Sequence, residues 1–600
     1  MTAQDPARIL PRQTLDFLLY DWLQVERLTG RERFADHDRA GFDGVMDTAA
    51  RIAAEHFAPH NRKGDLNEPR FEDGKVRLIP EVGEALGVFR DAGFFAPSQD
   101  YALGGLQLPF VVQTAAFAWF QAANIATSAY PFLTTAAANL LAAYGSPEQI
   151  EAYVKPMLEG RFFGTMCLSE PHAGSSLGDI TTRAVPQADG SYRIHGSKMW
   201  ISGGDHELSE TIVHLVLARM EGTPAGVKGI SLFVVPRHLL DEAGRPAQRN
   251  DVVLAGLNHK MGYRGTVNTL LNFGEGAFSP NGQAGAVGWL VGREGEGLTA
   301  IFHMMNEARI GVGASAAALA STGYLHALDY ARNRPQGRPV GDRNPLSPQV
   351  PIMRHADVRR MLLAQKSYAE GGLALALYSA LLADDAATAG TEDERRRAGR
   401  LLDLLTPVAK SWPSQWGLTA NDLAIQIHGG SGYTRDYPVE QFYRDNRLNP
   451  IHEGTHGVQG LDLLGRKAIA EGGAGLDLLI AQVSNTARKV ADMPDLSQAA
   501  GDLLNLFERL RTATRTLWAD GQPARALSDA TLYLEVMGHL VVAWLWLDIA
   551  RISRGESALH QGKRHAARYF LERELPRTEP MLAILETGDA TVLDMPDESF

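Results

Sequence analysis

The sequence predicts an α+β fold in which one β domain interrupts a mostly helical chain. Apolar residues recur at helical spacing before residue 162 and again after Gly292. The intervening segment, 162–285, is instead rich in short β-branched runs separated by turn residues. The 600 residues also exceed the roughly 250 to 300 that one hydrophobic core serves, so we expect several domains.

The first helical part follows an N-terminal extension over 1–40. Segments such as 44–56 place apolar residues at helical spacing, which indicates helices. Ser146 is predicted to cap one of them, with Pro147 at its first helical position. We therefore expect an N-terminal helical domain over 41–161.

The central β domain is predicted over 162–285. Its runs 211–217 and 229–235 are short, β-branched and bounded by glycine, proline or charged turns, as strands are. The Asp-Gly pair inside 188–191 predicts a hairpin turn between two of the strands.

Helical patterning returns over 286–470, with 298–334 almost continuous. Five prolines exclude a helix over 335–351 and predict a long connection, a kind of loop that is often functional. The glycine-rich break 471–475 then precedes an appended helical domain over 476–600.

Composition narrows the function classes. The net charge of −12 argues against nucleic-acid binding. The single cysteine, Cys167, allows no internal disulfide, and no secretory signal opens the chain, so we expect a cytoplasmic protein. The strongest late apolar run, 541–547, meets Asp548 well short of the roughly 20 residues that a membrane span needs, so we expect no integral membrane segment.

Two elements of the β domain could meet a ligand. Residues 169–176 combine hydroxyls and a glycine after the first strand, so backbone N–H groups could approach a ligand closely, although an ordinary strand-exit turn has the same composition. Trp200 and Ser202 place an aromatic ring and a hydroxyl on one later strand, although a tryptophan there could equally belong to the core.

A third element, 426–433, is glycine-rich and frees backbone amides for an anion or a dinucleotide. Its glycines follow a helix rather than a strand, so it is not a Rossmann fingerprint, and nicotinamide binding is not predicted. Glu453 lies beyond it on a loop, which suits a general base whose pKa burial raises. A surface glutamate capping the next helix is the alternative.

The segment 452–456 matches the His-Glu-x-x-His zinc motif literally. Zinc binding would need both histidines on one helical face. Pro450 lies immediately upstream and Gly454 lies inside the motif, so His452 is poorly placed in a helix. We therefore predict no metal site and keep a zinc peptidase only as an alternative.

Taken in order, these motifs resemble those of the acyl-CoA dehydrogenase family of flavoproteins over about 40–470. Segment 167–175 resembles the family's first flavin signature, and 426–430, with 437–440 and 444–445, resembles the second. The resemblance implies an N-terminal helical domain, a central β-barrel-like domain and a C-terminal four-helix bundle. The N-terminal extension and the appended helices are similar to the roughly 600-residue bacterial branch, which includes medium- and long-chain acyl-CoA dehydrogenases and methylthiopropanoyl-CoA dehydrogenase.

The resemblance implies FAD-dependent α,β-dehydrogenation of a saturated acyl-CoA to the trans-2-enoyl-CoA, in fatty-acid β-oxidation and on medium to long chains. Glu453 is then the catalytic base, which removes the α-proton while the β-hydrogen passes to the flavin. The positions that match FAD-binding residues of the family are Ser169, Trp200, Ser202, Arg334, Gln426, Gly430 and Thr455. The positions that match substrate-side residues are Ser175 and Arg309.

Some positions depart from the family pattern. The segment 333–338 is one residue short and lacks a phenylalanine, His452 replaces an aromatic residue, and Gly457 replaces a glutamine that often touches FAD. The base and the main flavin hydroxyls are kept.

The resemblance also implies an acyl-CoA substrate and electron-transferring flavoprotein as electron acceptor. We expect a homodimer, because Leu540, Trp544 and Leu547 offer an apolar face that could cover the surface through which shorter members form tetramers. The alternatives kept open are a methylthiopropanoyl-CoA dehydrogenase, a non-catalytic flavoprotein of the same fold, and the zinc peptidase.

Overall fold

The computed structural model describes residues 5–589 and 591–600, without the side chains of His303 and Met304. Contacts group the chain into two compact units. The barrel unit contains Asp47–Leu108 and Ala123–Ala308, and the helical unit contains Asp5–Met46, Pro109–Ala122 and Arg309–Phe600. Helices α2 (Arg39–Ile52) and α9 (Gly297–Asn333) contribute residues to both units.

The barrel unit begins with helices and then turns to strands. Its helices are α3 (Ala58–Leu66), α4 (Pro80–Asp91), α6 (Ile125–Tyr144), α7 (Pro147–Gln149) and α8 (Lys155–Leu158). The predicted cap at Ser146 is confirmed: its Oγ accepts a hydrogen bond from the Gln149 N–H at 3.2 Å, and the Gln149 side chain accepts one from the Ser146 N–H at 3.1 Å. Sequence pattern and local structure agree here because the cap involves neighbouring residues.

The strands form a sheet that closes on itself. They are β3 (Phe162–Cys167), β4 (Arg183–Pro186), β5 (Tyr192–Ser202), β6 (Thr211–Met220), β7 (Ile230–Pro236), β10 (Val252–Leu257), β11 (Asn268–Phe273) and β12 (Ala286–Val291). β5 pairs with β12, β12 with β7, β7 with β6, β6 with β4, and β4 with β5 again. This ring confirms the predicted barrel-like domain, and the β4–β5 hairpin confirms the turn at 188–191.

Smaller hairpins complete the barrel unit. They are β1 (Arg70–Glu72) with β2 (Lys75–Arg77), and β8 (His238–Leu240) with β9 (Pro246–Arg249). The hydrophobic core lies between α6 and strands β3, β6 and β7, where the alternate side chains of each strand point inward. Core members include Leu140, Leu141, Phe162, Val213, Leu215 and Leu232, all fully buried.

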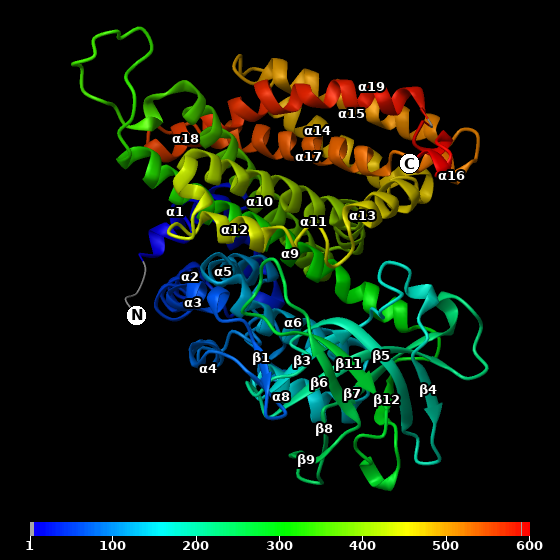
Figure 1. Cartoon of the computed structure of the whole chain (residues 1–600). Coiled ribbons are helices and arrows are strands. Elements are labelled where there is room, and N and C mark those ends of the chain that lie inside the picture. The colour runs from blue at the N-terminus through cyan, green and yellow to red at the C-terminus, as the bar shows by residue number, and fades with distance from the viewer. Residues whose placement is uncertain (1–4, 590) are drawn as a thin grey trace. The chain divides into compact units, whose positions relative to one another are not determined.

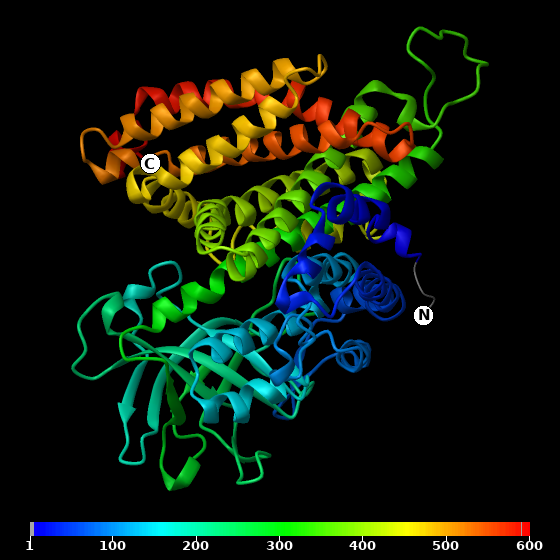
Figure 2. The same ribbon diagram turned by 180° about the vertical axis from the view of Figure 1, so that it is seen from behind.

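The helical unit is built from helices of very different lengths. Besides part of α9 they are α1 (Arg12–Asp16), α5 (Phe110–Ala123), α10 (Ala356–Thr388), α11 (Glu392–His428), α12 (Val439–Asn446), α13 (His456–Asp462), α14 (Ala474–Lys489), α15 (Ser497–Leu517), α16 (Pro523–Ala526), α17 (Ala530–Ile552), α18 (Ala558–Tyr569), α19 (Thr578–Thr587) and α20 (Thr591–Asp594). Figures 1 and 2 show α10, α11 and α17 side by side, so the appended helices pack directly on the preceding bundle.

The proline-rich connection over 335–351 has no helix, as predicted. Its two ends pair, because the Gln336 N–H donates to the Val350 carbonyl at 2.9 Å and the Val350 N–H donates to the Gly337 carbonyl at 3.1 Å. The loop extends away from the helices of its unit in both views (Figures 1 and 2). Val340, within this loop, is 98% exposed.

Helix α17 corrects the sequence argument about membrane segments. The apolar run does not stop at Asp548: the helix spans 23 residues and is long and apolar enough to cross a membrane by length and composition. Of its most apolar 18-residue window, 83% is buried inside the protein. The Asp548 carboxylate pairs with Arg551, one turn further along the helix, at 2.8 Å and also accepts a hydrogen bond from Trp22 Nε1 at 2.9 Å. The local pattern could not reveal the second of these partners.

Buried polar contacts tie the N-terminal extension to this unit. Lys563 Nζ donates to Glu370 at 2.9 Å and to the Thr14 hydroxyl at 3.3 Å, and all three side chains are buried. The extension, the first bundle helices and the appended helices therefore share one charged cluster.

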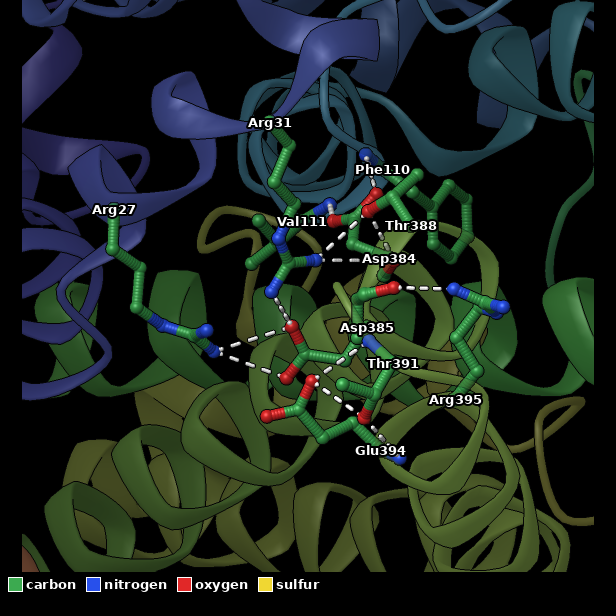
Figure 3. A network of polar contacts seen from close by, with 11 residues as sticks. Arg27, Arg31, Phe110, Val111, Asp384, Asp385, Thr388, Thr391, Glu394 and Arg395 are labelled. Atoms are coloured by element: carbon green, nitrogen blue, oxygen red, sulfur yellow. Dashed lines mark hydrogen bonds and ion pairs between the residues drawn. The ribbon is translucent and has the colours of Figure 1, made fainter.

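A second network joins the extension to the start of α5 (Figure 3). Asp384 accepts hydrogen bonds from the backbone N–H groups of Phe110, at 2.8 Å, and Val111, at 2.9 Å, so it satisfies two donors at the N-terminus of α5. Arg31 donates to the Thr388 hydroxyl at 2.8 Å one turn further along α10. Three segments that are distant in sequence meet at this point.

Candidate functional site

The loop after β3 is fixed by a buried ion pair that the motif analysis did not include. Lys198 Nζ lies 2.9 Å from Glu170 Oε1, and both side chains are at most 2% exposed. Glu170 also accepts hydrogen bonds from the backbone N–H and the hydroxyl of both Thr181 and Thr182. The Ser169 carbonyl accepts from the Met199 N–H at 3.0 Å, so the loop lies directly beside β5.

Trp200 lies on an irregularity of β5. The register against β11 shifts between Ile201 and Lys198, so two residues of β5, Met199 and Trp200, face one residue of β11. Trp200 has a φ of 66°, which is strained for a bulky residue, and its side chain is 60% exposed. The alternative of a core tryptophan is therefore wrong, and the indole offers an open aromatic face.

Ser202, predicted to bind FAD, and Ser175, predicted on the substrate side, differ in their surroundings. Ser202, at the end of β5, is half-buried, and its Oγ accepts a hydrogen bond from Asn268 Nδ2 at 3.0 Å, so its own proton is available for another acceptor. Ser175 is exposed on the loop after β3. Within the barrel unit the structure thus brings Ser169 and Trp200 to adjoining segments, with Ser202 on the same strand as Trp200.

In the helical unit, Arg334 and the 426–430 segment lie at neighbouring helix ends. Tyr330, one turn before Arg334, stacks on His428 with ring centroids 4.3 Å apart. Gln426, Gly430 and Arg334 are exposed. An added Cβ at Gly430 would meet nothing within 4 Å, so a ligand can approach the backbone here.

These exposed groups suit parts of FAD. The guanidinium of Arg334 can form charge-assisted hydrogen bonds with a pyrophosphate, and the Gln426 amide can both donate and accept. The bare glycine turn admits a flat or extended group, and in the barrel unit an open indole beside hydroxyl donors suits a flavin ring. Each unit taken by itself therefore offers donors that fit one part of the cofactor.

Glu453 lies on a loop, in a left-handed turn. Its φ is 52°, and that of Gly454 is 86°. Gln459 Nε2 donates to the Glu453 carbonyl at 3.0 Å, and Lys410 Nζ donates to the Gly454 carbonyl at 2.7 Å. Thr455, not Glu453, caps α13, because its Oγ1 accepts from the Val458 N–H. The alternative of a helix-capping glutamate is therefore wrong.

The environment of the Glu453 side chain makes its carboxylate a stronger base than an exposed one. None of the residues that the structure describes forms a hydrogen bond or an ion pair with it. Burial raises the pKa of Glu453, against the opposing positive charges of Lys410 and Arg309. A carboxylate with a raised pKa and free lone pairs has the properties required of a general base.

Arg309 is only 3% exposed and lies 3.0 Å from Asp462 of α13. The predicted substrate-side arginine therefore has a carboxylate partner that the motif analysis did not include. Its charge reaches Glu453, so Arg309, Lys410 and Glu453 form one electrostatic group in the helical unit.

The literal zinc motif does not form a helical pair of ligands. Helix α13 begins at His456, so His452 lies outside it. His452 Nε2 lies 3.0 Å from Asn449 Oδ1, and His456 Nε2 lies 3.1 Å from Gln415 Oε1. Within 5–589 and 591–600 no group of three or more His, Cys, Asp or Glu side chains could hold a metal ion.

Lys410 was missed by the sequence analysis, although a signal was present. It is one charged residue on a helix between apolar neighbours, as in Leu404, Leu405, Val408 and Ala409, and all of these are buried. A lone lysine at an apolar helical position indicates a buried charge, but not the partner of that charge.

The chain matches four family descriptions in order. They are the acyl-CoA dehydrogenase N-terminal domain over 43–161, its middle domain over 165–274, its C-terminal domain over 295–468, and the acetyl-CoA dehydrogenase C-terminal-like domain over 479–596. The last covers the appended helices.

Among relatives, 3-methylmercaptopropionyl-CoA dehydrogenase of Ruegeria pomeroyi is 36% identical, with 95% of this chain and 96% of the relative covered. The broad-specificity linear acyl-CoA dehydrogenase FadE5 of Mycobacterium tuberculosis is 33% identical, with 97% and 98% covered. In fold the chain is similar to ACDH-11 of Caenorhabditis elegans, with a TM-score of 0.78 at 19% identity over 98% of this chain and 94% of that one.

The chain belongs to the acyl-CoA dehydrogenase family. It is an FAD-dependent oxidoreductase of the roughly 600-residue type, and its substrates are acyl-CoA thioesters. The predicted family, fold and cofactor are confirmed.

Proposed function

We propose that the enzyme oxidises saturated acyl-CoA thioesters to trans-2-enoyl-CoA products with Glu453 as the catalytic base. One observation carries the assignment of the base: the Glu453 carboxylate is half-buried, has no hydrogen-bonding partner among the described residues and has a raised pKa. FAD, when bound, accepts the β-hydrogen and its electron pair. The α-proton moves to a carboxylate oxygen of Glu453, and the electrons of that C–H bond become the new C=C bond.

The residues proposed to hold FAD are Ser169, Trp200, Ser202, Arg334, Gln426, Gly430 and Thr455. Ser175 and Arg309 are proposed on the substrate side. The open indole, the available serine hydroxyl and the exposed guanidinium support these assignments. Arg309 is buried and ion-paired, so its proposed action on the substrate is through its charge rather than through a direct bond.

The substrate range is proposed as medium to long linear chains, with 3-methylthiopropanoyl-CoA as the second candidate. The name of the Mycobacterium tuberculosis relative, a broad-specificity linear acyl-CoA dehydrogenase, supports linear chains. The name of the Ruegeria pomeroyi relative supports the second candidate. Anaerobic bleaching of the flavin absorbance by a panel of acyl-CoA chain lengths, with 3-methylthiopropanoyl-CoA included, separates them. We further propose electron-transferring flavoprotein as electron acceptor and the cytoplasm as location.

We also propose a homodimer and the five-part division 1–40, 41–161, 162–285, 286–470 and 476–600. Leu540, Trp544 and Leu547 are at most 5% exposed, and Trp546 Nε1 donates to the Ser367 carbonyl at 3.2 Å. The appended helices thus cover α10 within one chain, which supports the dimer. A mass near four times 65.2 kDa in light scattering would contradict it.

Glu453→Gln tests the base. The amide keeps the shape and loses the basic oxygen, so we expect kcat to fall by about 10³-fold or more while FAD content stays at the wild-type level. Glu471→Gln is the matched control, because Glu471 also has a positive φ, of 50°, but is exposed. Its activity should be unchanged. Activity of Glu453→Gln above a few per cent would move the base elsewhere.

A further inference from the structure

Lys410 differs from other buried lysines of this chain. Lys198, Lys467 and Lys563 each lie within 2.9 Å of a carboxylate oxygen. The side chain of Lys410 is also fully buried, yet among the described residues it forms no ion pair and donates instead to the carbonyl of Gly454. A buried ammonium without a paired carboxylate is costly to fold, so stability does not explain this lysine.

The position of Lys410 beside the turn that contains Glu453 explains the presence of this buried lysine better than stability does. Its amino group holds the carbonyl that follows Glu453, in a turn where both Glu453 and Gly454 have positive φ. Gln459 fills the space beside Gly454, since an added Cβ there would lie 2.5 Å from Gln459 Nε2. Lys410 and Gln459 thus hold the carbonyls of a strained two-residue turn whose first side chain is the proposed base.

We propose that Lys410 is the positioning residue of this enzyme's base: it fixes the Glu453–Gly454 turn and places a positive charge beside the Glu453 carboxylate. The inference rests on the proposed function of Glu453. The hydrogen bond to Gly454 survives deprotonation of Lys410, because a neutral amine still donates, whereas the charge does not. Lys410 therefore sets both the position and the acidity of the base, through separable effects.

Several charged or titratable groups face Lys410. Glu453 and His452 lie on the loop, His456 lies on α13, and Arg309, which pairs with Asp462, lies on α9. Burial lowers the pKa of Lys410 to about 7, with Glu453 raising it and Arg309 lowering it further. Burial also lowers the pKa values of His452 to about 3 and His456 to about 4, so both are neutral where the base works.

The test is the pH profile of kcat/KM for Lys410→Met and Lys410→Gln, with the saturated acyl-CoA that the wild type turns over fastest. Both variants remove a positive charge that lowers the pKa of Glu453, so the acidic limb, which reports that pKa, should move upward by about one pH unit. Lys410→Gln keeps a donor for Gly454, so its kcat at the plateau should exceed that of Lys410→Met by about threefold to tenfold.

Lys563→Met is the matched control, since it removes another fully buried lysine of the same unit, paired with Glu370 and not with the loop. It should lower stability and leave the acidic limb in place. The proposal would be overturned if both Lys410 variants kept full FAD content and the acidic limb of their kcat/KM profiles stayed at the wild-type pH. Loss of folding in both would also overturn it, because the lysine would then serve stability. An active Glu453→Gln would instead refute the proposed function itself.

Discussion

Two glutamates of this chain each interact with a buried lysine, yet the pKa of one is lowered and that of the other is raised. Glu170, in the barrel unit, lies 2.9 Å from Lys198 and accepts four further hydrogen bonds from Thr181 and Thr182. Glu453, in the helical unit, receives none from the described residues, and its lysine, Lys410, binds a carbonyl instead.

The acidity of the two carboxyls follows. Burial alone would raise the pKa of Glu170, but the charge of Lys198 and the hydrogen bonds from Thr182 and Thr181 outweigh it and lower the pKa to about 2. At Glu453 the burial effect prevails and the pKa is raised. A neighbouring lysine therefore does not decide whether a glutamate is a structural ion or a base. What decides is whether the lysine and other donors directly reach the carboxylate oxygens, as they do at Glu170.

Among the substitutions of charged groups, Glu170→Gln should give the largest loss of stability. It leaves the Lys198 ammonium buried without a counter-ion, which costs about 3 kcal/mol of unfolding free energy. Denaturant unfolding at pH 7 measures this. Glu210→Gln, which breaks an exposed pair with Arg161 in the same unit, should cost under about 1 kcal/mol. Equal losses of unfolding free energy in the two variants would contradict the expected difference between buried and exposed ion pairs.

The pH dependence of that loss sharpens the comparison. The folded-state pKa of Glu170 is depressed below the ordinary 4.5, so its stabilisation is present above pH 4.5 and is lost as the pH falls toward about 2. The gap between wild type and Glu170→Gln should therefore be constant from pH 7 to about 5 and close below that. A gap that stays open at pH 2 would show that packing, not charge, is lost.

Asp384 is an intermediate case: it has two backbone donors and, among the described residues, no ion pair (Figure 3). Burial raises the pKa of Asp384 to about 7, against the hydrogen bonds from Val111 and Phe110. Because the folded pKa exceeds the unfolded one, its contribution to stability is present below pH 4 and is lost as the pH rises through 7. Relative to Asp384→Asn, the wild type should lose about 2 kcal/mol between pH 5 and pH 7. Parallel unfolding curves would contradict this.

Trp200→Gly should have the smallest effect on stability. The glycine relieves a positive φ, and the exposed indole contributes little packing, so the free energy of unfolding should stay within about 1 kcal/mol of wild type. Flavin content after gel filtration should nevertheless fall. Trp289→Gly, which removes a half-buried tryptophan packed on the barrel core, is the comparison and should destabilise strongly.

Local patterns predicted much of this molecule. The strands, the cap at Ser146 and the helix-free connection 335–351 depend on residues close together in sequence, and the loop position of Glu453 follows from nearby Pro450 and Gly454. The motif resemblance added the family and the cofactor, which no periodicity could supply.

What the sequence could not show depends on distant partners. The carbonyl that Lys410 binds is 44 residues away, and Trp22, which donates a hydrogen bond to Asp548 of α17, is 526 residues away. The positive φ of Trp200 arises from a register shift against β11, so it depends on the pairing of two strands. None of these has a signature within one turn or one strand.

The Thr14–Lys563 contact has a consequence for biosynthesis. Its two residues are 549 positions apart, so the ribosome must add the whole intervening chain before the N-terminal segment can reach this partner. At about 5 to 20 residues per second, that interval is about half a minute to two minutes. The N-terminal segment thus completes its contacts only after nearly all of the chain has been synthesised.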